Sequence, residues 1–160
     1  MSLSFRKKEP KDMLAKARRD LRRLEDAESA KDSDAMSDAL MDVSVSLASV
    51  RDWLRAHASK TTSFTPKEID ACETSSVPLG SFRDVANELK HGGRPSRDSQ
   101  TADVLLSAPS SRLPAPADDF PRMKVIRKDG ARHRALELAR SAINDWEAFL
   151  RTHRLLSIEA

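Results

Sequence analysis

A run of apolar residues at three- and four-residue steps between residues 33 and 58 constrains the fold of this chain more than any other feature. The run consists of Met36, Leu40, Val43, Leu47, Val50 and Leu54, with Trp53 beside it. This heptad-like spacing puts the run on one face of a long helix, and the KDSD segment before it supplies capping side chains. Such a face packs at a shallow angle against a partner helix, so the chain is predicted to form a helical bundle.

Helical periodicity extends to three other segments. A first helix is predicted over residues 10–28, where one stripe contains Leu14, Ala17, Leu21 and Leu24. A short helix is predicted to begin at Pro66, with Thr65 as its cap and Glu68 completing a capping box. The last helix is predicted over residues 132–154 from the recurring residues Leu136, Ala139, Ile143, Trp146 and Leu150.

The segment RDVANELKH is predicted to form a further helix that ends before two glycines. Ser81 can cap this helix, and Gly92, Gly93 and Pro95 stop it. Its inward face is expected to contain Phe82, Val85, Ala86 and Leu89. The opposite side gathers the reactive residues Arg83, Asp84, Asn87, Lys90 and His91.

Residues 94–121 differ in composition from the helical segments. They are rich in Ser, Pro, Ala and Asp, and they contain one apolar island, Ala102 to Leu106. The island is expected to pair with Met123 to Arg127, a segment in which apolar and basic residues alternate. The turn signal Asp129-Gly130 follows this segment. We therefore predict an all-α single domain over 1–160, with about four main helices, a small β-hairpin before the last helix and a flexible loop or insertion at 94–121.

Composition excludes several classes of protein. The chain has 160 residues, 33% of them charged, and no apolar run near the roughly 20 residues that cross a bilayer. Cys72 is the only cysteine and the first residues lack a signal-peptide core, so a reducing, cytoplasmic setting is expected. His57, His133 and His153 have no second ligand at metal-site spacing, and no phosphate-cradling glycine loop occurs. Neither a metal nor another cofactor is predicted.

Basic residues cluster near the end of the chain. The cluster contains six candidate nucleic-acid-binding residues, Arg122, Lys124, Arg127, Lys128, Arg132 and Arg134, followed by Arg140. These side chains could follow a phosphate backbone. The chain also has an acidic block, with seven acids against one lysine in residues 24–45. The alternative is therefore that the opposite blocks pair with each other inside the fold or merely keep it soluble.

The polar stripe of RDVANELKH has the residue types for metal-independent RNA cleavage. His91 titrates nearest to neutrality, so it is the natural general base or acid for the ribose 2′-hydroxyl and the leaving group. Arg83 and Lys90 could stabilise charge on the phosphorus oxygens, and Asn87 could orient His91 or a phosphate. The alternative is that Asn87, Lys90 and His91 cap the C-terminus of their own helix, with Gly92 in the left-handed conformation.

The segment from Arg83 to His91 resembles the signature of the HEPN superfamily, in which four to six residues separate an Arg from a following His on a late helix. HEPN proteins are small helical bundles that include prokaryotic toxin and phage-defence ribonucleases. The chain also resembles small bacterial proteins with an R…N..KH helix, a hairpin and a last helix, through the residues Asn87, Lys90, His91, Trp146 and Leu150. The resemblance implies a HEPN-like bundle, RNA as substrate and a protein partner such as an antitoxin.

Seven residues separate Arg83 from His91, which puts them about 12 Å apart along a helix. HEPN ribonucleases usually form their site across a dimer, so a two-fold axis near Asn87 would be needed to bring the two residues together. A homodimer is also expected because helix 33–58 has apolar residues on a second side, including Met41 and Val45. Two other functions stay open, namely non-catalytic binding of nucleic acid or a protein partner, and a purely structural oligomer.

Overall fold

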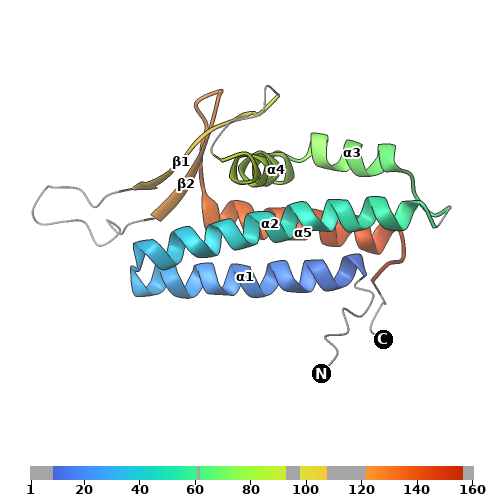
Figure 1. Cartoon of the computed structure of the whole chain (residues 1–160), viewed down its shortest axis with the longest axis horizontal. Helices are drawn as coiled ribbons and strands as arrows, with labels where there is room; N and C mark the ends of the chain where they lie inside the picture. The colour runs from blue at the N-terminus through green and yellow to red at the C-terminus, as the bar shows by residue number, and fades with distance from the viewer. Residues whose placement is uncertain (1–8, 61, 93–97, 108–121, 157–160) are drawn as a thin grey trace, which may run out of the picture.

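The computed structural model describes residues 9–60, 62–92, 98–107 and 122–156. These residues form, in chain order, the elements α1 (Pro10–Ala30), α2 (Ser33–Ala58), α3 (Pro66–Ser75), α4 (Val77–Lys90), β1 (Thr101–Ser107), β2 (Arg122–Arg127), β3 (Arg132–Arg134) and α5 (Ala135–Thr152). The protein is mostly helical with one small sheet (Figure 1). None of the described helices is long and apolar enough to cross a membrane.

The predicted long helix is confirmed as α2, which lies at the centre of the molecule. α1 and α5 pack against it, and α4 and α3 lie on the side of α2 that faces away from α1 (Figure 1). The predicted apolar face is buried throughout; Met36, Val43 and Leu54 have no exposed surface. Trp146 of α5 is also buried, and its indole N–H donates a hydrogen bond to the Leu47 carbonyl at 3.2 Å. The core is therefore formed mainly by contacts between helices.

The predicted pairing of the two apolar segments is confirmed, but the hairpin is part of a three-stranded antiparallel sheet. β1 pairs with β2, and β2 pairs in turn with β3. The prediction that the last helix begins at residue 132 was wrong, since α5 begins at Ala135. Gly130 has a φ of 85°, which reverses the chain so that residues 132–134 pair with residues 124–126.

The start of α4 also differs from the prediction, because Ser76 and not Ser81 caps the helix. The Ser76 hydroxyl accepts a hydrogen bond from the Leu79 N–H at 3.1 Å. Pro78 lies in the first turn, where its missing N–H costs nothing, so the helix begins before this proline. Ser81 is buried within the helix. Of the predicted flexible segment 94–121, residues 98–107 are described and contain β1; the others lie outside the described residues.

Candidate functional site

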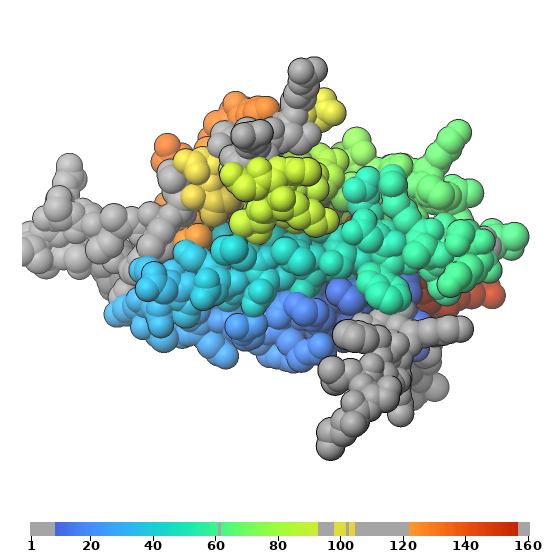
Figure 2. All heavy atoms as spheres, in the orientation of Figure 1, coloured from blue at the N-terminus to red at the C-terminus, as the bar shows by residue number. Residues whose placement is uncertain are grey.

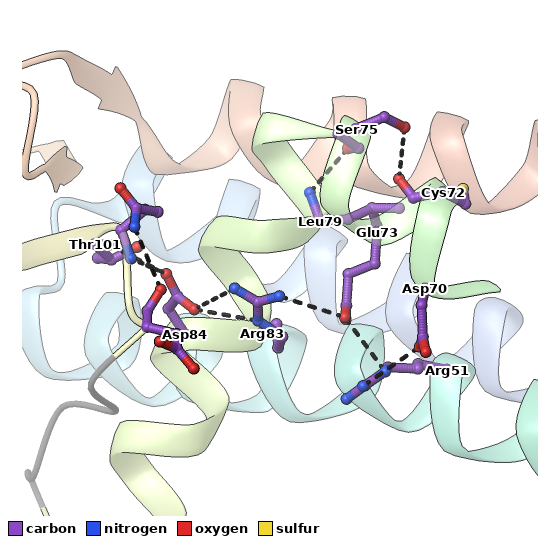
Figure 3. A network of polar contacts seen from close by, with 12 residues as sticks. Arg51, Asp70, Cys72, Glu73, Ser75, Leu79, Arg83, Asp84 and Thr101 are labelled. Atoms are coloured by element: carbon purple, nitrogen blue, oxygen red, sulfur yellow. Dashed lines mark hydrogen bonds and ion pairs between the residues drawn. The ribbon is translucent and has the colours of Figure 1, made fainter. Parts of the chain in front are cut away.

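Arg83 of α4, the predicted transition-state cation, takes part in a network of ion pairs and hydrogen bonds that joins α2, α3, α4 and β1. Its Nε and Nη2 donate to Asp84 Oδ1 at 3.2 and 2.9 Å, and its Nη1 lies 3.6 Å from Glu73 Oε2. Figure 3 shows the guanidinium lying between the two carboxylates. Burial lowers the pKa of Arg83, but the bonds from Asp84 and Glu73 outweigh it and raise the pKa overall. Arg83 is therefore a permanent cation with two internal counter-charges.

Asp84 is buried, although the sequence pattern placed it on the exposed polar side of the helix. Its Oδ2 accepts hydrogen bonds from the backbone N–H groups of Gln100 at 2.7 Å and Thr101 at 3.1 Å (Figure 3). A buried carboxylate needs such donors to offset its lost hydration, and here they come from the chain that enters β1. The expectation that Asp84 avoids the interior was wrong because this chain covers that side of the helix.

Glu73 of α3 is the second buried acid in the network, and the sequence analysis did not single it out. Its Oε2 lies 3.3 Å from Arg51 Nε of α2, in addition to the contact with Arg83. The pKa of Glu73 is raised overall, because the effect of burial exceeds the opposite effect of the neighbouring Arg51 and Arg83. One acid on a short helix has no local sequence signal that marks it as buried. The network stabilises the arrangement of helices, and a phosphate at the partly exposed Arg83 would have to compete with two carboxylates for the guanidinium.

The other three predicted catalytic residues lie at the C-terminal end of α4. Asn87 is half-buried, while Lys90 and His91 are exposed, and no hydrogen bond or ion pair joins these side chains to any described residue. His91 closes the helix with its backbone N–H, which donates to the Asn87 carbonyl at 3.1 Å. The left-handed conformation predicted for Gly92 is confirmed by its φ of 64°. The catalytic role of Asn87, Lys90 and His91 stays a prediction. The structure records no hydrogen bond or ion pair between these three described side chains and Arg83.

The six predicted nucleic-acid-binding residues lie in β2, β3 and the turn between them, residues 122–134, which we call the basic ribbon. Three of the six interact within the protein. Arg134 forms an ion pair with Glu28 of α1, and Arg122 Nε lies 4.0 Å from the same carboxylate. Arg127 contacts Asp129 at 3.7 Å and donates to the Ser81 hydroxyl at 3.3 Å.

Lys124, Lys128 and Arg132 form no ion pair within the part of the chain that the structure describes. Lys124 lies opposite Arg134 and Ile126 lies opposite Arg132, so these four residues share one face of the sheet. Met123 and Val125 are buried on the other face, against the helices. On this face Arg132 is exposed and Lys124 and Ile126 are partly exposed, whereas Arg134 is ion-paired with Glu28.

Part of the basic cluster is ion-paired with the acidic block of the chain. This pairing is the alternative interpretation of the charge pattern. Besides the two contacts of Glu28, Arg140 Nη2 lies 2.7 Å from Glu25 Oε1. Glu25 and Glu28 belong to the acidic block at residues 24–45. Only the cations that remain after this pairing are available for another molecule.

The described residues contain no group of three or more His, Cys, Asp or Glu that could hold a metal ion. Cys72 of α3 is partly buried, and burial raises the pKa of its thiol to about 11, with smaller contributions from Asp145 and Glu73. A neutral thiol is a weak nucleophile, so Cys72 is not a catalytic candidate.

Comparison of the chain with protein-family models, with curated proteins and with solved structures finds no match. The likeness to HEPN proteins therefore rests on the residues of α4 and α5 quoted above.

Proposed function

We propose that this protein binds nucleic acid through the basic ribbon, without catalysis. The observation that carries the proposal is that Lys124, Lys128 and Arg132 have no ion-pair partner among the described residues, while their neighbours Arg122, Arg127 and Arg134 do. Cations without internal partners can contact a phosphate backbone directly. They then displace the counterions that are condensed on the backbone, and the release of these ions favours binding.

The shape of the basic ribbon supports this proposal. It is an antiparallel β-hairpin whose strands join at the Asp129-Gly130 turn, with Arg132 on the edge strand β3. The basic ribbon is the outer pair of strands in the three-stranded sheet, so its cations lie along the edge strand β3, the turn and the neighbouring strand β2, where they can follow a phosphate backbone. The partly exposed Ile126, on the same face as Arg132, adds an apolar surface that a base can contact.

The test measures binding of fluorescently labelled single-stranded RNA and duplex DNA by anisotropy. The variant Lys124→Ala/Lys128→Ala/Arg132→Ala is expected to bind at least about tenfold more weakly than the wild type. A control variant removes the same charge from exposed positions outside the sheet, Arg22→Ala/Lys60→Ala/Lys67→Ala. Equal losses in both variants would mean that net charge, and not the basic ribbon, drives binding.

The HEPN-like endoribonuclease is a second proposal, favoured by the exposure of His91. Incubation of the protein with mixed RNA in EDTA tests it directly. A ribonuclease of this kind leaves cyclic phosphate ends, and its activity is lost on His91→Ala while the fold is retained. The same reaction with Arg83→Ala would show whether the ion-paired guanidinium has any part in the chemistry. Intact RNA with wild-type protein would leave binding as the function.

A further inference from the structure

An apolar groove lies between α2, α4 and the sheet, on a side of the protein that the proposed nucleic-acid contact does not use. Its volume is about 410 Å³, and its apolar lining comes from Leu40, Met41, Val85, Leu89, Val104 and Met123. In Figure 2, α4 lies directly above α2 on the face in view. The volume is within the range of about 300–1,000 Å³ that is usual for ligand pockets.

Apolar residues continue from the groove onto the exposed surface of α2. Met41 lines the groove and is 46% exposed, and Val45, one turn further along, is 41% exposed. Large apolar side chains next to an apolar groove form a contiguous patch, which marks an interaction site more reliably than single exposed residues. A partner that covers this patch would remove both side chains from water.

Charge around the groove specifies the chemistry of that partner. Glu88 and Asp103 are among the lining residues, and none of the described lining residues is a lysine or an arginine. Asp34 and Asp38 are also exposed on the first turns of α2, beside Ser37 of the lining. The groove is therefore apolar at its centre and acidic at its rim, which complements an apolar segment flanked by cations.

A second copy of the chain fits this surface poorly. In a two-fold dimer the same patch is contributed by both subunits. The rim acids Glu88, Asp103 and Asp38 of both copies would then lie in one interface, where their combined negative charge opposes association. The rim charge therefore disfavours a self-contact here.

We propose that the groove binds a basic amphipathic helix of another protein, with apolar side chains in the groove and Lys or Arg against Glu88 and Asp103. Helices that bind in this way place anchors at i, i+3, i+4 and i+7. The groove between α2 and α4 supplies the apolar receptor, and exposed Met41 and Val45 extend it. Among the described lining residues only Met123 belongs to the basic ribbon, and it lies on the face opposite Lys124 and Arg132, so the variants that test the groove leave the proposed nucleic-acid contacts in place.

The probe is a synthetic helical peptide of about 18 residues, with Leu at the anchor positions and Lys elsewhere. Binding to the full chain is measured by anisotropy and mapped by amide chemical shifts. Shifts are expected along α2, α4 and β1. Two control peptides separate the two parts of the proposal: one replaces Lys with Glu, and one scrambles the order so that the apolar face is lost. Each is expected to bind at least about tenfold more weakly.

Matched variants locate the contact. Met41→Gln/Val45→Thr should weaken binding at least about tenfold, whereas Val77→Thr, at a 43% exposed apolar residue of α4 outside the groove, should leave it unchanged. Glu88→Gln/Asp103→Asn should weaken binding and reduce its salt dependence, whereas Asp26→Asn/Asp52→Asn should not. Circular dichroism establishes that each variant is folded.

Three results would overturn the proposal. Equal binding of the three peptides would show that no amphipathic helix is recognised. Peptide shifts confined to other elements would place the contact elsewhere. A light-scattering mass of a dimer that becomes a monomer in Met41→Gln/Val45→Thr would show that a second copy covers the groove, which is the homodimer predicted from the sequence.

Discussion

Asp84 shows how one buried carboxylate positions two elements that are joined by a long connection. It accepts hydrogen bonds from two backbone N–H groups at the start of β1 and from two guanidinium N–H groups of Arg83. Hydrogen bonds to an ionised group are stronger than neutral ones, and here they are shielded from water. The position of the sheet on α4 therefore depends on the charge of this side chain.

The variant Asp84→Asn tests that dependence. The amide has one acceptor oxygen in place of two, and its NH₂ group would face either Arg83 or the backbone donors of Gln100 and Thr101. The free energy of unfolding is expected to fall by about 2–4 kcal/mol. Urea denaturation followed by circular dichroism measures it, with the exposed Asp52→Asn as control. A loss equal to that of the control would contradict the assigned role.

Cys72 provides a test of burial at α3. At pH 8 a thiol with a pKa of about 11 is about a thousandth ionised, whereas the unfolded chain with the ordinary pKa of 9.0 is about a tenth ionised. Alkylation by iodoacetamide is therefore expected to be about a hundredfold slower in the folded protein than in denaturant. The folded rate should rise about tenfold per pH unit between pH 8 and 10. Rates within threefold of each other at pH 8 would show that the thiol is not shielded.

At the scale of elements, the sequence predicts what local periodicity and capping determine. The bounds of α2 and the start of α3 follow from the apolar stripe at Met36 to Leu54 and the capping box at Thr65. The start of α4 has a local signal of the same kind, Ser76 with Pro78 in the first turn, which the choice of Ser81 as cap overlooked; the existence of β3 has no such signal. β3 is three residues long and forms only by pairing with β2, a tertiary contact that a local pattern does not contain.

Ser76 is the residue that decides where α4 begins. Its hydroxyl caps the helix at the Leu79 N–H and also donates to Asp145 of α5. Ser76→Ala removes both bonds, so the free energy of unfolding is expected to fall by about 1–2 kcal/mol. Thermal denaturation measures the change, with the neighbouring exposed Ser75→Ala as control. A larger effect at Ser75 would indicate a different helix start.

At the scale of the whole molecule, the candidate sites depend on which charges neutralise one another. The sequence identifies six cations between residues 122 and 134, but only folding brings Glu28 to Arg134 and Arg122. The same holds for Arg83, whose partner Glu73 is on another helix. A sequence therefore predicts which charged side chains a site contains. The fold determines which of them are already ion-paired within the protein and which remain available to a ligand.

The salt dependence of nucleic-acid binding tests the role of the basic ribbon most directly. Anisotropy titrations of single-stranded RNA at several salt concentrations give the slope of log K against log salt. Each phosphate contact contributes about 0.7 to this slope, so removal of Lys124, Lys128 and Arg132 is predicted to reduce its magnitude by about 2. The control variant at Arg22, Lys60 and Lys67 should keep the wild-type slope. Identical slopes for the wild type and the ribbon variant would contradict the account.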